Sequence, residues 1–207
     1  MTVPTIFETC QPRADVLKGA VAEADFAADL AQVIAGRGPE EYLDPARFFA
    51  NTYPTRGLAN LLVNVCRRLS GTGGEAAAIF RLDTSYGGGK THGLIALAHA
   101  VRGLQGVPGI AEFIDPSLLP DGHVRLAAFD GENADPANGR AMGDGVLAHT
   151  PWGEIAYGLA GKGGYERVRV SDGSHTAPGA ETLQELFGGE PTLILLDELS
   201  VYLRKVR

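Results

Sequence analysis

Several features that define particular classes of protein are scarce in this chain. It has two cysteines among 207 residues, Cys10 and Cys66, and their positions fit no metal-binding or redox motif. No apolar run approaches the ~18 residues that a membrane-spanning helix needs, and no charged-then-apolar leader begins the chain. These absences predict a protein without membrane association that works in a reducing cytoplasm.

Positive charge is also in short supply. The chain carries 18 lysines and arginines against 25 aspartates and glutamates, which gives a net charge of −7. This balance argues against a surface built as a whole to wrap nucleic acid, and the two basic exceptions, Arg67-Arg68 and residues 204–207, are short. The apolar fraction of 44% and the charged fraction of 21% are otherwise typical of a globular protein with a buried core.

Helical patterns dominate residues 1–74, which we assign to a helical N-terminal segment. Apolar residues recur at helical spacing over residues 26–34. Asp44 and Thr55 stand where the N-caps of two further helices are expected, and the helix after Thr55 carries one continuous apolar stripe. Residues 70–75, rich in glycine, form the clearest linker in the chain.

Strands and helices alternate over residues 75–207. Three strands are expected, at residues 76–83, 123–131 and 193–196. Helices are expected after the glycine loop, after the capping residue Thr150 and over residues 181–187, whereas residues 132–145 are expected to form a loop. This order predicts an α/β fold with a parallel sheet covered by helices.

A glycine-rich stretch lies between the first of these strands and the helix that follows it. The stretch Thr84-Ser-Tyr-Gly-Gly-Gly-Lys-Thr91 matches the phosphate-binding loop G-x-x-x-x-G-K-[ST], except that a threonine replaces the first glycine. Backbone N–H groups of such a loop bind phosphates, Lys90 can reach the β- and γ-phosphates, and the Thr91 hydroxyl can ligate Mg²⁺. A glycine-rich turn with a solvated lysine is the alternative. The candidate ATP-binding residues are Thr84, Ser85, Tyr86, Gly87, Gly88, Gly89, Lys90, Thr91 and His92, and Lys90 is also a candidate catalytic residue.

An acidic motif lies at the end of the third expected strand. Four aliphatic residues, 193–196, precede Asp197 and Glu198, and a buried parallel strand brings its carboxyl end to the edge of the sheet where ligands bind. We expect Asp197 to hold Mg²⁺ and Glu198 to deprotonate the water that attacks the γ-phosphate. Such a pair alone is also common in solvated turns. An acidic pair at the end of a strand that comes after a glycine loop in the chain predicts a P-loop NTPase.

Four stretches carry a closer likeness: "FFANTYPTRGL", "YGGGKTHGL", "TPWGEIAYGL" and "PGAETLQEL…LILLDELSVYLR". Together they resemble a family of large prokaryotic predicted ATPases that carry a domain of unknown function and are often encoded beside DNA methyltransferases in anti-phage loci. The Asp-Glu pair is similar to that of the additional-strand ATPases, the branch that holds AAA+ and RecA-like proteins. The resemblance implies ATP binding, Mg²⁺-dependent hydrolysis and DNA-directed defence, with a DNA methyltransferase or other defence proteins as partners.

The resemblance also implies a larger sheet than this sequence accounts for. In the additional-strand class a further strand lies between the phosphate-loop strand and the acidic strand, whereas only residues 199–207 follow Glu198. We therefore expect an N-terminal piece of a longer protein, with a truncated core over residues 75–207 and with the sensor and arginine finger elsewhere. Contacts with DNA are then expected from the missing part, from a homo-oligomer that gathers basic patches around a channel, or from a partner.

Other polar residues have two interpretations each. His92 can approach a phosphate or pack between helices, and Tyr53 can stack on adenine or pack in the core. Asp130 and Glu132, at the end of the second expected strand, suit either a metal-adjacent role or solvation in a loop. The remaining histidines share no metal-binding spacing and are interpreted as structural.

Three candidate functions follow from these patterns. The leading one is an ATP-hydrolysing module that drives movement or switching on DNA or on a partner protein. The alternative is a non-hydrolysing, nucleotide-gated switch or assembly scaffold. Glu198 favours hydrolysis, and the missing sensor favours the switch. A small-molecule phosphotransferase is the weakest candidate because the sequence contains no recognisable substrate lid.

Overall fold

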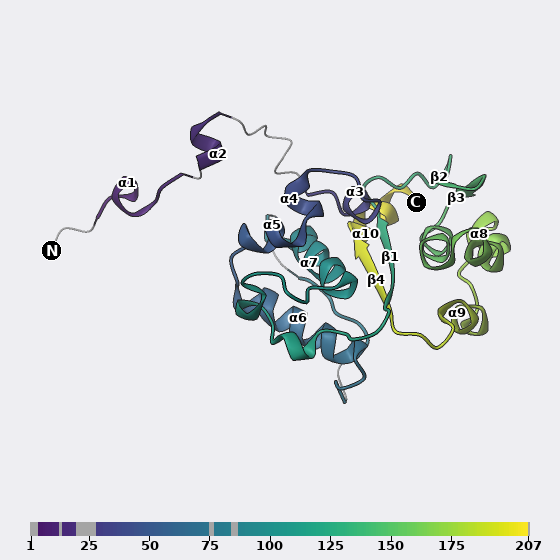
Figure 1. Cartoon of the computed structure of the whole chain (residues 1–207). Coiled ribbons are helices and arrows are strands. Elements are labelled where there is room, and N and C mark those ends of the chain that lie inside the picture. The colour runs from purple at the N-terminus through teal and green to yellow at the C-terminus, as the bar shows by residue number, and fades with distance from the viewer. Residues whose placement is uncertain (1–3, 13, 20–27, 75–76, 84–86, 207) are drawn as a thin grey trace.

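A pair of parallel strands lies at the centre of the protein. A computed structural model describes residues 4–12, 14–19, 28–74, 77–83 and 87–206 (Figure 1). Strands β1 (Arg125–Asp130) and β4 (Thr192–Asp197) pair along their whole length, so that Asp130 and Asp197 are partners at the carboxyl end. The two strands therefore end side by side, each on an aspartate.

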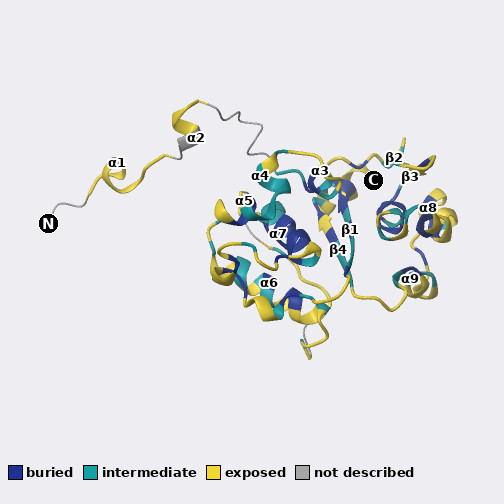
Figure 2. Cartoon of the chain, viewed as in Figure 1, coloured by how far each residue is buried: buried dark blue, intermediate teal, exposed yellow. Residues whose placement is uncertain are grey.

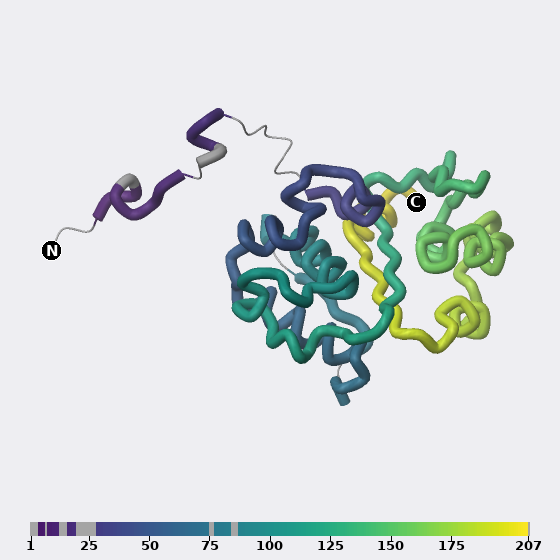
Figure 3. The backbone as a smooth tube through the Cα atoms, viewed as in Figure 1, coloured from purple at the N-terminus to yellow at the C-terminus, as the bar shows by residue number. Residues whose placement is uncertain are grey.

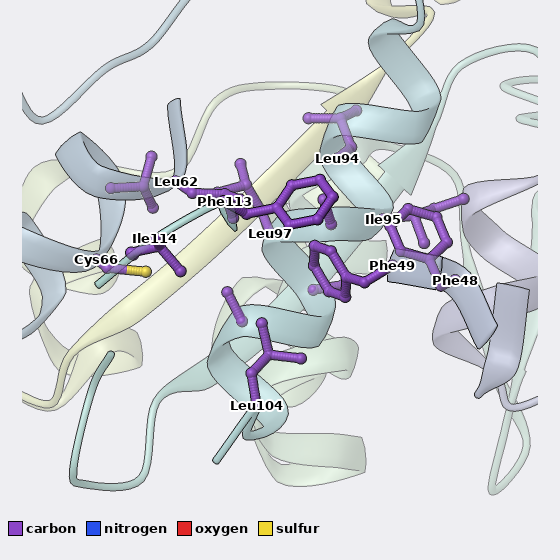
Figure 4. Close-up of a cluster of buried hydrophobic side chains, with 14 of the residues drawn as sticks. Phe48, Phe49, Leu62, Cys66, Leu94, Ile95, Leu97, Leu104, Phe113 and Ile114 are labelled. Carbon is purple, nitrogen blue, oxygen red and sulfur yellow. The ribbon is translucent and has the colours of Figure 1, made fainter. Parts of the chain in front are cut away.

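One face of the strand pair packs against helices that lie between residue 30 and residue 102. Leu126 and Leu195 contribute to this largest core, which draws buried side chains from α3 (Leu30–Ile34), α5 (Pro45–Ala50), α6 (Arg56–Leu69) and α7 (Lys90–Arg102). Figure 4 shows part of it, with Phe48 and Phe49 beside α7. Their rings meet edge to face, with centroids 5.2 Å apart. Helices α3, α5 and α6 of the N-terminal segment thus share a core with the strands.

The other face is covered by the C-terminal helices. Ala127 and Phe129 alternate with the side chains of the first face and pack with Ile155 of α8 (Pro151–Gly173) and Tyr202 of α10 (Leu199–Lys205). Helix α8 lies close to β1 because Gly158 carries no side chain: an added Cβ would stand 3.1 Å from Ala127 Cβ. Helices on both faces of two parallel strands make a three-layer α/β architecture, as the alternating pattern predicts (Figure 3).

The remaining elements are short. They are α1 (Ile6–Thr9), α2 (Ala14–Leu17), α4 (Glu40–Leu43), α9 (Ala180–Phe187), the 3₁₀ turns Ile110–Glu112 and Pro116–Leu118, and strands β2 (Arg140–Gly143) and β3 (Val146–Ala148). Buried residues gather in α7, at the end of β1 and in α8 (Figure 2). Within the described ranges, no helix has both the length and the apolar character needed to cross a membrane.

Capping residues set the beginnings of the helices as the sequence predicts. Asp44 accepts from Ala46 N at 2.8 Å, and Thr55 Oγ1 accepts from Leu58 N at 3.2 Å. Thr150 Oγ1 accepts from Gly153 N at 3.3 Å at the start of α8. Each cap satisfies an N–H group that the first turn of a helix leaves without a backbone partner.

The expected strand before the glycine loop is wrong over its described part. Residues 77–83 form no strand, and the Ile79 side chain is 87% exposed. The apolar run suits a strand locally, but a strand exists only through hydrogen bonds to a neighbour, and β4 pairs only with β1 in the described residues. Ala76 lies outside them.

The expected loop over residues 132–145 is also wrong at its end. Strands β2 and β3 form an antiparallel hairpin there. Asp144 and Gly145 make its turn with φ values of 51° and 73°. An Asp-Gly pair is a common signal for such a turn, so the hairpin was visible in the sequence.

Candidate functional site

The glycine loop bends sharply into α7 through left-handed backbone. Gly87 and Gly89 have φ values of 77° and 72°, and an added Cβ at either would meet no atom within 4 Å. Glycine is therefore favoured at both positions for the backbone conformation and not for space. Lys90 and Thr91 are the first two residues of α7, so they lie at the positive end of the helix dipole. Thr84, Ser85 and Tyr86 lie outside the described residues.

One hydrogen bond joins the two motifs that the sequence singles out. Thr91 Oγ1 donates to Asp197 Oδ2 at 2.7 Å, across 106 residues of chain. Asp197 is only 7% exposed, and its other oxygen accepts from Glu198 N at 3.1 Å. Both oxygens of this carboxylate are thus held in place at the end of β4, beside the start of α7.

A pocket of about 290 Å³ opens at this junction. Of the described glycine-loop residues, only Thr91 lines it, together with Asp197 and Glu198 from the end of β4. The rest of the lining comes from the end of β1 and the loop after it, and from the start of α3 and the two residues before it: Ala28, Asp29, Leu30, Asp130, Glu132 and Asn133. Five carboxylates therefore surround the pocket, which suits a cation or the cation-bound end of a ligand.

Asp130 belongs to this pocket, and its interpretation as a solvated loop residue is wrong. It is 7% exposed, and its Oδ1 accepts from Glu132 N at 2.9 Å while its Oδ2 accepts from the Asn133 side-chain amide. Glu132 itself is exposed at the edge of the pocket. In-register pairing of β1 with β4 places Asp130 next to Asp197.

His92 packs against α5 and the residues that flank it, and is not among the residues that line the pocket. Its Nε2 lies 2.8 Å from Thr52 Oγ1, and its ring stacks on Phe48 with centroids 4.3 Å apart. Burial lowers the pKa of His92, which favours the neutral ring. These contacts are those of a residue that packs between helices. Tyr53 is 81% exposed, so its expected place in the core is wrong.

The "TPWGEIAY" segment holds the hairpin onto the start of α8. Asp172, with 0% exposure, accepts from Thr150 N at 2.9 Å, from Thr150 Oγ1 at 2.6 Å and from the Tyr165 hydroxyl at 3.1 Å. Gly153 is required beside it, because an added Cβ would overlap the Asp172 carboxylate. This segment, one of those that carry the resemblance, thus forms a packing contact between β3 and α8.

The same segment contains a buried carboxyl group that the sequence analysis did not single out. Glu154 is 4% exposed, and burial raises its pKa to about 7 although Arg140 Nη1 lies 3.2 Å from its Oε2. The negative charges of Asp130 and Asp172 raise this pKa further. Its spacing from Arg140 along the chain gives no local signal of this pairing.

The cysteines and remaining histidines show no arrangement for metal binding in the described ranges, where no group of three or more His, Cys, Asp or Glu side chains is placed to hold an ion. This finding does not bear on a Mg²⁺ site made of a threonine and a carboxylate, because Mg²⁺ bound together with phosphates takes only one or two carboxylates from the protein. Cys66 is buried, which raises the pKa of its thiol to about 11 and keeps it unreactive at neutral pH.

Residues 28–30 were not predicted to approach the site. The start of α3 lines the pocket, with Asp29 capping the helix through Gln32 N at 3.0 Å. Nothing in the local sequence indicates this approach, because it depends on how α3 packs against α7 and β1.

Comparison with known proteins gives the family. Residues 6–207 match the family described as the DUF499 N-terminal domain, and the chain belongs to this family. No curated protein matches the sequence, and no solved structure matches the fold.

Proposed function

We propose that this protein is an ATP-binding module of the P-loop type that hydrolyses ATP with Mg²⁺. The observation that carries the proposal is the 2.7 Å hydrogen bond between Thr91 Oγ1 and Asp197 Oδ2. It brings together the hydroxyl that follows the loop lysine and the acidic residue at the end of a parallel strand. A glycine-rich turn with a solvated lysine has no reason to meet such a carboxylate.

Phosphate binding is supported by the start of α7. Left-handed Gly89 ends the loop, and the N–H groups of the first helical turn that follows have no backbone partners within the helix. Those groups and the helix dipole attract a phosphate, and Lys90 at the first helical position adds a full positive charge. In the proposed complex these groups bind the β- and γ-phosphates.

The residues present fit a magnesium ion. Thr91 and Asp197 offer a hydroxyl and a carboxylate oxygen, which are the hard donors that Mg²⁺ prefers, and their short contact makes them adjacent. Thr91 and Asp197 are the residues that would hold the ion. When bound, Mg²⁺ would neutralise charge on the phosphate oxygens.

Hydrolysis needs a base, for which Glu198 is the candidate. It lines the pocket directly after Asp197, and its N–H is fixed on the Asp197 carboxylate. In the proposed step a water oxygen bonds to the γ-phosphorus as the bond to the β–γ bridging oxygen breaks. Glu198 accepts the proton that the water loses, and ADP leaves with the electron pair of the broken bond.

One observation favours the alternative, a nucleotide-gated switch that does not hydrolyse ATP. Residues 77–83, just before the loop, pair with no strand in the described residues, and the hydrogen bond from Thr91 to Asp197 links the start of α7 to the end of β4. A nucleotide that orders this side of the site would act as a switch. In either case we propose, from the resemblance alone, a role in anti-phage defence with a DNA methyltransferase or another defence protein as partner.

Thermal unfolding with and without MgATP tests nucleotide binding. MgATP should raise the Tm of the wild type and of Lys162→Ala, whose lysine lies on α8, but not that of Lys90→Ala. At a ligand concentration a hundred times Kd, linkage predicts about 2.7 kcal/mol of added stability. Equal stabilisation of all three proteins would refute the assignment of Lys90.

The variant Glu198→Gln distinguishes an ATP-hydrolysing module from a nucleotide-gated switch that does not hydrolyse ATP. The amide keeps the shape of the side chain and removes the base, so ATP binding should remain while hydrolysis falls by ~10²–10⁴-fold. The measurement is the rate of phosphate release, made on the protein in the form that its host produces. Unchanged release in the variant would show that Glu198 is not the base, and no release by the wild type would favour the switch.

A further inference from the structure

Helix α10 presents one continuous face to the end of β1 and the loop after it. Glu198 is the N-cap of this helix, and Tyr202 and Lys205 follow it by about one and two helical turns. Tyr202 is buried and meets the Phe129 ring edge to face, with centroids 5.2 Å apart. The candidate base therefore immediately precedes α10 and Lys205 ends it, while Tyr202 between them is held against β1.

At the first end, the backbone of Glu198 contacts Gly131. Gly131 N donates to Asp197 O at 3.0 Å, and an added Cβ on Gly131 would overlap the Glu198 carbonyl oxygen. Only glycine allows this approach. The loop that leaves β1 is thus pressed directly against the peptide unit that carries Glu198.

At the other end, Lys205 binds the same loop. Its Nζ donates to the carbonyl oxygens of Gly131 at 3.1 Å and Ala134 at 2.9 Å, and to that of Glu132. One ammonium group uses all three of its donors on one short loop. This loop supplies Glu132 and Asn133 to the lining of the pocket.

The backbone of Glu198 needs such support. Its φ of 45° and ψ of 36° lie in the left-handed region, which is unfavourable for a residue with a side chain. Conformations of this kind persist only where the surrounding structure holds them. Gly131 contacts the strained residue, and Lys205 holds Gly131.

We propose that Lys205 is a positioning residue that fixes Glu198 for hydrolysis through the backbone of residues 131–134. The inference rests on the proposed function, because it assigns Lys205 a part in the reaction of the same site. Lys205 touches neither nucleotide nor metal in this scheme. Its removal should loosen the loop and the base while leaving Lys90 and Thr91, which bind the phosphates, in place.

The variant Lys205→Met keeps the apolar stem and removes the donors. We expect kcat for ATP hydrolysis to fall roughly tenfold to a hundredfold, as small misplacements of catalytic groups do. The KM and the Kd for MgATP should stay within about twofold, since binding residues are untouched. Lys205→Arg, which retains charge and donors, should recover most of the rate. Lys162→Met, which removes a lysine bonded to a single carbonyl oxygen at 3.4 Å, is the matched control.

Two further measurements distinguish positioning from a general loss of stability. Amide hydrogen exchange should become faster at Gly131 and Glu132 in Lys205→Met without ligand, while exchange in α6 stays unchanged. In a Glu198→Gln background, Lys205→Met should cause no additional loss of rate, because its effect passes through the base.

The outcomes separate this inference from the proposed function. Unchanged exchange at residues 131–134, an unchanged kcat, or a further loss in the Glu198→Gln background would each overturn the role of Lys205. Failure of the wild type to bind or hydrolyse ATP overturns the proposed function, and with it the catalytic role of Lys205, without any Lys205 variant being needed.

Discussion

Replacement of Asp172 by alanine is the most informative test of how the C-terminal helices hold the fold together. Its carboxylate lies between α8 and the β2–β3 hairpin, with no exposure to solvent. Besides the bonds from Thr150 and Tyr165, it accepts from His149 N at 3.2 and 3.1 Å through its two oxygens. Alanine would remove every one of these acceptors at once.

The expected cost follows from the donors left behind. The Tyr165 hydroxyl has a second acceptor, Leu147 O at 3.0 Å, and the Thr150 hydroxyl can rotate. The backbone N–H groups of His149 and Thr150 cannot move away. At about 1–3 kcal/mol for each buried donor without a partner, Asp172→Ala should lower the free energy of unfolding by about 2–6 kcal/mol. This is a large share of the ~5–15 kcal/mol that stabilises a typical domain.

Asparagine gives a graded comparison. Its carbonyl oxygen can keep the bonds to Thr150, and its amide can donate to the Tyr165 hydroxyl oxygen. Asp172→Asn should therefore cost only about 1–2 kcal/mol, the difference between charged and neutral hydrogen bonds. Asp121→Ala, which removes an exposed aspartate, is the control for the loss of one negative charge.

The assay is equilibrium unfolding in urea, followed by two probes. Trp152 is the only tryptophan and lies at the start of α8, so its fluorescence reports on the perturbed contact between β3 and α8. Far-ultraviolet circular dichroism reports on all helices. Coincident transitions would show that this contact is lost together with the rest of the fold, and an earlier fluorescence transition would show local opening. A loss below about 1 kcal/mol in Asp172→Ala would refute the reasoning from unsatisfied donors.

Two other predictions concern charge. Burial raises the pKa of Glu154 to about 7 from 4.5, so the folded protein binds this proton more tightly than the unfolded chain does, and wild-type stability should fall as the pH rises through this window. Glu154→Gln should remove that fall and, with unfolding compared at about pH 4 and pH 8, stabilise only at the higher pH, by up to ~3 kcal/mol. Destabilisation at pH 8 would mean that the ion pair with Arg140 outweighs burial. Residues 1–207 should bind duplex DNA weakly or not at all, because Arg67-Arg68 and residues 204–207 can neutralise few phosphates. Submicromolar binding at physiological ionic strength, lost steeply as salt is added, would contradict this.

Much of the local structure was determined by short stretches of sequence. Asp44, Thr55 and Thr150 cap their helices because a side-chain oxygen two or three residues from an open N–H group reaches it in any context. The aliphatic run before Asp197 forms the parallel strand β4 as expected, but the strand is not buried on both faces, because Leu196 is 44% exposed. Short stretches of sequence also identified four candidate residues, Lys90, Thr91, Asp197 and Glu198.

Other features were decided only by tertiary structure, because they depend on partners far away in the chain. Residues 77–83 have the composition of a strand and are not one, since strand pairing comes from a neighbour and not from the run itself. The buried state of Asp130 and the role we propose for Lys205 arise where β1, β4 and α10 meet. The contact between Thr91 and Asp197 spans 106 residues, so the sequence could propose both residues as parts of one site, but only the packing of α7 against β4 brought them together.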